Sequence, residues 1–140
     1  MTETAITRPD AKLWSAQVAG RVITPGDATA FTVPSGQVVT LQEMILDMPS
    51  AETAIYRFRY IAPAISRSSG TLDFEASIAD MQHLCDAYAM PNIASRSPEK
   101  VQVIISFADM PVPFGETNPE VTQFIVAFSV KDGHCMLEPF

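Results

Sequence analysis

Few residues of this chain could do chemistry, and most are spaced so that they cannot act together. Asp80 and His83 are one helical turn apart, where a carboxylate could orient a histidine base. No serine or threonine stands in a recognisable nucleophile turn, and the sequence contains no glycine-rich phosphate loop, CxxC pair or HExxH motif. We therefore expect a non-enzymatic protein and keep a small hydrolase-like site at Asp80 and His83 as the least favoured alternative.

Potential metal ligands are also scattered. His83 and Cys85 are two residues apart in a helical pattern and point about 200° apart, while His134 and Cys135 face opposite sides of a strand pattern. Thioether ligands for copper(I) could come from three Met-Pro pairs: Met48-Pro49, Met90-Pro91 and Met110-Pro111. Methionines are more often core residues, so we predict no metal and no cofactor. A small-ligand or copper(I)-binding periplasmic carrier is the alternative.

Two arginines are neighbours in the strongest strand pattern of the chain, residues 54–62 (AIYRFRYIA). Its three alternating aromatic residues should face a helix, which leaves Arg57 and Arg59 together on the opposite face. There they could pair with Glu43 or Asp47 across a hairpin, at little gain in stability. They could also bind an anion, because two guanidinium groups suit a carboxylate or phosphate. Arg57 and Arg59 are our anion-binding candidates.

One long helical pattern covers residues 73–90 (DFEASIADMQHLCDAYAM). Its apolar side chains recur at alternating spacings of four and three, with Leu84 widening the stripe: Phe74, Ile78, Met81, Cys85 and Tyr88. Asp73 is the expected N-cap, and Pro91 should end the helix. The stripe must pack against another apolar surface.

Strand patterns surround this helix at residues 37–48, 54–62, 101–108, 121–130 and 134–137, and Lys131-Asp132-Gly133 predicts a tight hairpin. The order β-β-α-β-β-β predicts an α+β fold with two layers, in which the helix covers one face of a mostly antiparallel sheet. Residues 31–140 should form this single domain. Residues 1–30 lack sustained periodicity and are predicted to be a flexible arm or tail.

Composition restricts the possible partners. The chain has 140 residues and a formal charge of −7, which argues against binding nucleic acid or anionic membrane surfaces. It contains no apolar stretch near the roughly 18 residues of a membrane span, so we expect a soluble protein without membrane insertion.

A protein partner is the role that we favour. Trp14 on the arm either covers an edge of the core or anchors such a partner, since exposed aromatic residues make good hot spots. The proline-containing loop at residues 109–118 is expected to be exposed, and its partner-binding candidates are Met110, Pro111, Pro113 and Phe114.

The two cysteines leave two interpretations open. Alternation in the last hairpin could point Cys135 toward Cys85 on the helix, but a one-residue shift in register would point it away. The pair is then either a disulfide or two buried thiols.

Several stretches resemble a family of small, mostly exported alphaproteobacterial proteins of unknown function, some of which are labelled acetolactate synthase. The resemblance covers about three quarters of the chain and rests on residues 33–43, 56–65, 80–85, 103–106, 108–116 and 132–140. Members commonly carry both cysteines, so the resemblance implies a Cys85–Cys135 disulfide and a periplasmic location. The chain is too short for a thiamine-dependent synthase. Residues 1–32 do not look like a leader, which would mean a cytoplasmic protein if this N-terminus is native. Together these observations predict an envelope protein that mediates interactions or supports an assembly.

Overall fold

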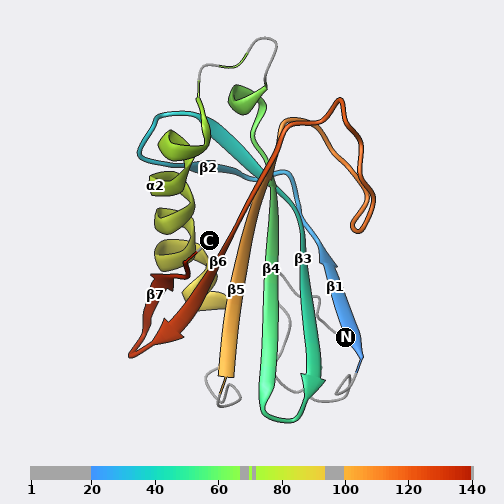
Figure 1. The fold of residues 1–140 in the computed structure, drawn as a ribbon, viewed down its shortest axis with the longest axis vertical. Coiled ribbons are helices and arrows are strands. Elements are labelled where there is room, and N and C mark those ends of the chain that lie inside the picture. Colours follow the sequence, from blue (N-terminus) through green and yellow to red (C-terminus); the bar gives the residue numbers. More distant parts are fainter. Residues whose placement is uncertain (1–19, 67–69, 71, 94–99, 140) are drawn as a thin grey trace.

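The computed structural model describes residues 20–66, 70, 72–93 and 100–139, and in these residues it shows an open seven-stranded sheet with one main helix on one face (Figure 1). The strands are β1 (Arg21–Pro25), β2 (Ala30–Thr32), β3 (Val38–Ser50), β4 (Thr53–Ile61), β5 (Lys100–Ala108), β6 (Gln123–Lys131) and β7 (His134–Leu137). The helical segments are η1 (Pro63–Ile65), α2 (Phe74–Leu84), η2 (Cys85–Ala89) and η3 (Met90–Asn92).

The strand order is β1-β3-β4-β5-β6-β7, and β2 also pairs with β3. Only the β4–β5 pair is parallel among the described strands, because the chain crosses over through α2 between them. The predicted α+β class, with a mostly antiparallel sheet and one main helix, is confirmed.

The N-terminal boundary of the domain differs from the prediction. The expectation that residues 1–30 form a flexible arm is wrong for residues 21–25, because β1 pairs with β3 from Arg21 opposite Asp47 to Pro25 opposite Glu43. Ala30 likewise begins β2. Residues 1–19, which include Trp14, lie outside the described residues.

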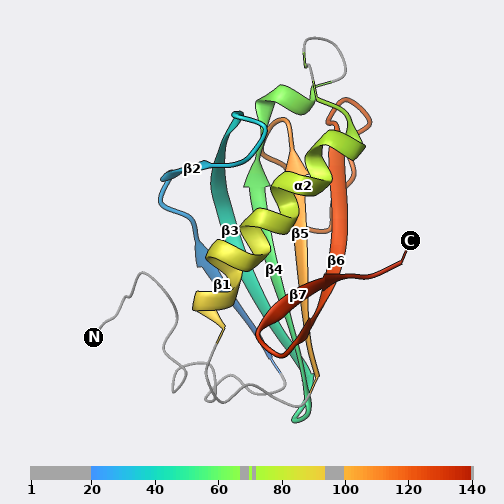
Figure 2. The same cartoon turned by 90° about the vertical axis from the view of Figure 1, so that its left-hand side faces the viewer.

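Figure 2 shows α2 lying across the sheet, in front of the strands. The aromatic residues of β4 are at most 3% exposed and pack in one core with the buried helix residues Met81, Leu84 and Cys85, as the alternation predicted. Asp73 caps α2 by accepting a hydrogen bond from the Ala76 N–H at 2.9 Å. The helical path does not end at Met90: it widens into a π-helical turn at Cys85–Ala89 and ends in the 3-10 turn Met90–Asn92, which accommodates Pro91.

Two polar residues also lie on the buried side of α2. Ser77 and Asp80 are fully buried, whereas Phe74, Ile78 and Tyr88 of the predicted stripe are only half-buried. The buried face of α2 therefore differs from the predicted stripe. The turn before β3 explains this difference, because it packs against the helix and supplies hydrogen-bond donors to the Asp80 carboxylate.

A disulfide joins Cys85 to Cys135, with their Cα atoms 6.2 Å apart. It fastens β7, which pairs only with β6 in the described sheet, to the helical layer. The Asp132 and Gly133 φ angles of 53° and 78° confirm the predicted tight hairpin that aims Cys135 inward. No helix within the described residues is long and apolar enough to cross a membrane.

Candidate functional site

The candidate site lies on the sheet face turned away from α2, which we call the open face. Strand alternation places Arg57 and Arg59 there. The sheet register sets Ile104 beside Arg57, Ser106 beside Arg59, and Ile125 beside Ser106. Charged, polar and apolar side chains therefore meet across β4, β5 and β6.

Residues 109–122 form a loop that folds back over this face, on the side of the sheet opposite α2 (Figure 1). The backbone N–H groups of Asp109 and Thr122 close its base by donating to the Thr122 carbonyl at 3.1 Å and to the Asp109 carboxylate at 2.9 Å. Further along, the Val112 carbonyl accepts hydrogen bonds from Arg59 Nη2 at 2.7 Å and Gln42 Nε2 at 3.2 Å. The sheet thus determines where the loop runs.

A tight turn at the tip of the loop positions Phe114. The Glu116 N–H donates to the Pro113 carbonyl at 3.2 Å, and Gly115 has a φ of +85°, which suits glycine at the third position of a type II turn. Phe114 therefore occupies the second position. Its ring centroid lies 5.0, 5.3 and 5.5 Å from the Cζ atoms of Arg21, Arg57 and Arg59. These are cation–π distances, so the ring and three guanidinium groups form one cluster.

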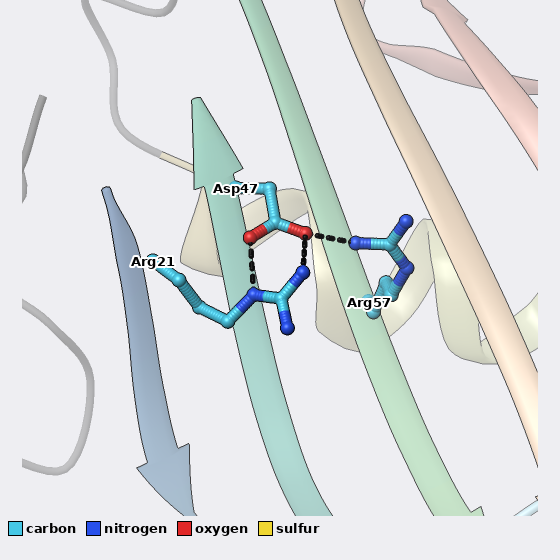
Figure 3. A network of polar contacts seen from close by, with 3 residues as sticks. All are labelled: Arg21, Asp47 and Arg57. Carbon is cyan, nitrogen blue, oxygen red and sulfur yellow. Dashed lines mark hydrogen bonds and ion pairs between the residues drawn. The ribbon is translucent and has the colours of Figure 1, made fainter. Parts of the chain in front are cut away.

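Carboxylates hold the arginines in place (Figure 3). Asp47 accepts two hydrogen bonds from Arg21, from Nε at 2.6 Å and Nη2 at 3.1 Å, and a third from Arg57 Nη1. Burial alone would raise the pKa of Asp47, but hydrogen bonds and charge from Arg21 and Arg57 outweigh it and hold the pKa below its ordinary value. Arg59 pairs with Glu43, directly across the β3–β4 ladder. The pairing alternative of the sequence analysis is therefore realised for both strand arginines.

Between the loop and the sheet lies a cleft of about 330 Å³. It is lined by Arg57 and Arg59 on β4, Ile104 and Ser106 on β5, Gln123 and Ile125 on β6, and residues 114–117 of the loop. We call it the Arg-Phe cleft. Chemically it offers an arginine edge beside apolar side chains, which suits binding of an amphipathic group. Two candidates that the sequence suggested separately, the arginines and Phe114, meet in it.

The other loop candidates have different surroundings. Met110, Pro111 and Pro113 are exposed, and none of them lines the Arg-Phe cleft. Sequence reasoning did not identify Arg21, Ile104 or Ile125 as site residues. Only the alternation of polar and apolar residues in β5 and β6 could have indicated that Ile104 and Ile125 share the arginine face.

The structure does not bring Asp80 and His83 together as a catalytic pair. Both carboxylate oxygens of Asp80 accept hydrogen bonds from the turn before β3: from the Ser35 N–H at 2.8 Å, Ser35 Oγ at 2.5 Å and Gln37 Nε2 at 2.7 Å. The His83 ring instead packs edge-on against Tyr88. No hydrogen bond joins Asp80 to His83 in the part of the chain described here. Asp80 thus fixes the turn to the helix.

Among the candidate metal ligands, Met48 and Met110 lie beside distant strand positions in the described structure. In residues 20–66, 70, 72–93 and 100–139, no group of three or more His, Cys, Asp or Glu side chains could hold a metal ion. Met48 follows Asp47, which pairs with Ile55, whereas Met110 lies two residues beyond Ala108, which pairs with Ile61. Ile55 and Ile61 are six residues apart along β4, so the strand positions next to the two methionines are separated by about 20 Å.

In comparisons with known proteins, the model of a family of unknown function (DUF6497) matches residues 13–140. No curated protein and no solved structure matched the chain. The family match includes β1, which the predicted arm had excluded from the domain. Since the family model covers well over half of the sequence, the chain belongs to the family of unknown function DUF6497.

Proposed function

We propose that this protein is a non-enzymatic binding protein that holds a small amphipathic molecule in the Arg-Phe cleft. The observation that carries the proposal is the convergence of Arg57 and Phe114, from elements far apart in the sequence, on one cleft of about 330 Å³. Small-molecule pockets measure about 300–1,000 Å³ and combine apolar walls with a few placed polar groups. Ile104, Ile125 and Phe114 supply such walls.

The contacts that hold the loop in place support a preorganised ligand site rather than a chance depression in the surface. The Val112 carbonyl is held by Arg59 and Gln42, and the turn around Gly115 fixes Phe114 over the sheet. Preorganisation of this kind lowers the entropy cost of binding.

An apolar fluorescent probe tests this proposal. We expect N-phenyl-1-naphthylamine, which is uncharged, to bind one saturable site, and Ile125→Asn to weaken its affinity about fivefold, because contact with an isoleucine is worth on the order of 1 kcal/mol. Ile23→Asn is the matched control: both isoleucines lie on the open face and are 55% and 53% exposed, but only Ile125 lines the cleft. Equal losses in the two variants, or no saturable binding, would argue against a ligand site here.

A protein partner is the second candidate, and the 44% exposure of Met110 on the same loop supports it. A partner that inserts an apolar side chain beside Phe114 would use the same cleft. It should then displace the probe from the wild-type protein, and Ile125→Asn should weaken its binding.

We also propose a periplasmic location. The Cys85–Cys135 disulfide supports an oxidising compartment, where such bonds persist. Intact mass after alkylation, measured with and without reductant on protein from its native cell fraction, tests this. Two cysteines that react only after reduction support the periplasm, and two freely reactive thiols in the denatured protein place it in a reducing compartment.

A further inference from the structure

We infer that the ligand of the Arg-Phe cleft is a compound with one carboxylate on an apolar body, and that Arg57 binds the carboxylate. This inference rests on the proposed binding function and specifies its ligand class. It follows from which guanidinium edge is available, what lies beside that edge, and how much charge the cluster carries.

Arg57 has a bidentate edge that no described residue occupies. Its Nη1 donates to Asp47, and among the described residues nothing accepts a hydrogen bond from its Nε or Nη2. Figure 3 shows this Nε/Nη2 edge turned away from Asp47, toward the side of β5. Arg21 shows the geometry that such an edge makes, because its Nε and Nη2 both donate to the Asp47 carboxylate. The Arg57 side chain is 23% exposed and lines the cleft, so a carboxylate entering from solvent can reach it.

Arg59 has a different role. Its two terminal nitrogens already donate, Nη1 to Glu43 and Nη2 to the Val112 carbonyl, and its side chain is only 7% exposed. Arg59 therefore anchors the loop. Of the two anion-binding candidates proposed from the sequence, Arg57 is the one that we assign to the ligand.

Apolar surface begins directly beside the available edge. The parallel register places Ile104 next to Arg57, and Ile125 lies one strand further, on β6. Phe114 bounds the same space from the loop. Adjacent strands are about 4.8 Å apart, so an apolar body about 10 Å long would run from Arg57 across β5 to β6. This length suits a phenylpropyl group or a medium-length alkyl chain.

Local charge selects a monoanion. Arg21, Arg57 and Arg59 face Asp47 and Glu43, which leaves one formal positive charge in the ion-pair cluster. Glu116 also lines the cleft, and the whole chain carries −7. With Glu116 the local formal charge is zero, so a phosphate dianion or a nucleotide would bring more uncompensated negative charge than one carboxylate does. A planar carboxylate also fits the guanidinium fork better than a lone point charge does.

Competition against the neutral fluorescent probe tests the ligand class. We expect 3-phenylpropanoate to displace the probe at about 10- to 100-fold lower concentration than 3-phenylpropanamide, because the amide loses a charge-assisted pair of hydrogen bonds. Acetate, which lacks the apolar body, and phenyl phosphate should both be weaker than 3-phenylpropanoate. Arg57→Gln should bring the acid to the level of the amide and leave the amide unchanged. This variant should fold, since Arg21 still pairs Asp47 on two atoms.

Lys131→Gln is the matched control, because it removes the same charge from an exposed position outside the cleft and should preserve the preference for the acid. Equal displacement by acid and amide in the wild-type protein, stronger displacement by phenyl phosphate, or a preference that survives Arg57→Gln would overturn the carboxylate inference and leave the binding function standing. Absence of binding by the probe and by 3-phenylpropanoate, measured directly by calorimetry, would overturn both.

Discussion

Removal of the Cys85–Cys135 disulfide should destabilise the protein by about 4 kcal/mol. The bond closes a loop of 50 residues, and the loss of loop-closure entropy from the unfolded chain gives about 4 kcal/mol at 25 °C. Unfolding entropy near 2.1 cal/mol/K per residue gives roughly 0.3 kcal/mol/K for the 140-residue chain, so the melting temperature should fall by about 14 °C. Urea unfolding of the Cys85→Ala/Cys135→Ala variant against the oxidised wild type measures the loss.

Reduced wild-type protein is the matched control, because reduction breaks the bond and keeps both buried sulfur atoms. The double variant should lose on the order of 1 kcal/mol more than the reduced protein, from truncation of two buried side chains. A loss under about 1 kcal/mol on reduction would refute the loop-entropy reasoning.

Reduction should leave the fold and the Arg-Phe cleft in place. The Cys135 backbone is held independently, since its carbonyl accepts from Gln82 Nε2 at 2.9 Å and its N–H donates to Asp86 Oδ1 at 3.2 Å. We therefore expect faster amide exchange in β7 and unchanged affinity for the neutral probe. Weakened probe binding in the reduced, folded protein would contradict the separation of the two faces.

Three substitutions test the open face, and two further substitutions serve as controls. Gly115→Ala should lower the free energy of unfolding in urea by about 1 kcal/mol and weaken probe binding, because alanine disfavours a φ of +85°. Gly133→Ala is the control: its φ of +78° should give a similar loss of stability and leave probe binding unchanged. Asp47→Asn should lower the free energy of unfolding at pH values above 3.8, the ordinary pKa of the carboxyl group, because the ionised carboxylate is paired in the folded state. Since the pKa of Asp47 is lower in the folded protein, the stability difference between wild type and variant should shrink as the pH falls through that lower folded-state pKa. A stability difference that does not change with pH would contradict the ion-pair account. Arg59→Met should lower the free energy of unfolding by about 3 kcal/mol, because two charge-assisted hydrogen bonds are lost, and should increase amide exchange in the 109–122 loop. Glu43→Gln is the control, because it keeps the hydrogen bond from Arg59 to the Val112 carbonyl. It should destabilise the protein less and leave amide exchange in the loop near the wild-type rate.

Strand alternation and helix periodicity were sufficient to predict the two-layer fold, because both report which face of an element is buried. They missed β1 because RVITP is short and ends in Pro25 before Gly26, and it becomes a strand only by pairing along the 13-residue β3. They also left Asp80 out of the predicted buried stripe of α2, although it is fully buried. Its burial depends on donors from Ser35 and Gln37, more than 40 residues earlier, which no local pattern contains.

The Arg-Phe cleft was predictable only in parts. Alternation placed Arg57 correctly on the face opposite the helix, and the prolines marked the loop that carries Phe114. Their meeting depends on the path of the loop, which is set by hydrogen bonds to the Val112 carbonyl. A backbone carbonyl has no signature in the sequence, so the two halves of the site were treated as separate alternatives.

The two faces of the sheet differ in how they contribute to stability. The helix face buries apolar side chains and the disulfide. On the open face, Ile45 is fully buried and Arg59 nearly so, although no helix covers them in the described structure. Burying an ion pair such as Arg59–Glu43 gains little net stability, since desolvation offsets the attraction, and an apolar pair of similar volume would often serve as well. The pair does supply one thing that an apolar pair would not: Arg59 also donates to the Val112 carbonyl and so holds the loop that presents Phe114. The arrangement is therefore better explained by positioning of the cleft than by stability of the sheet.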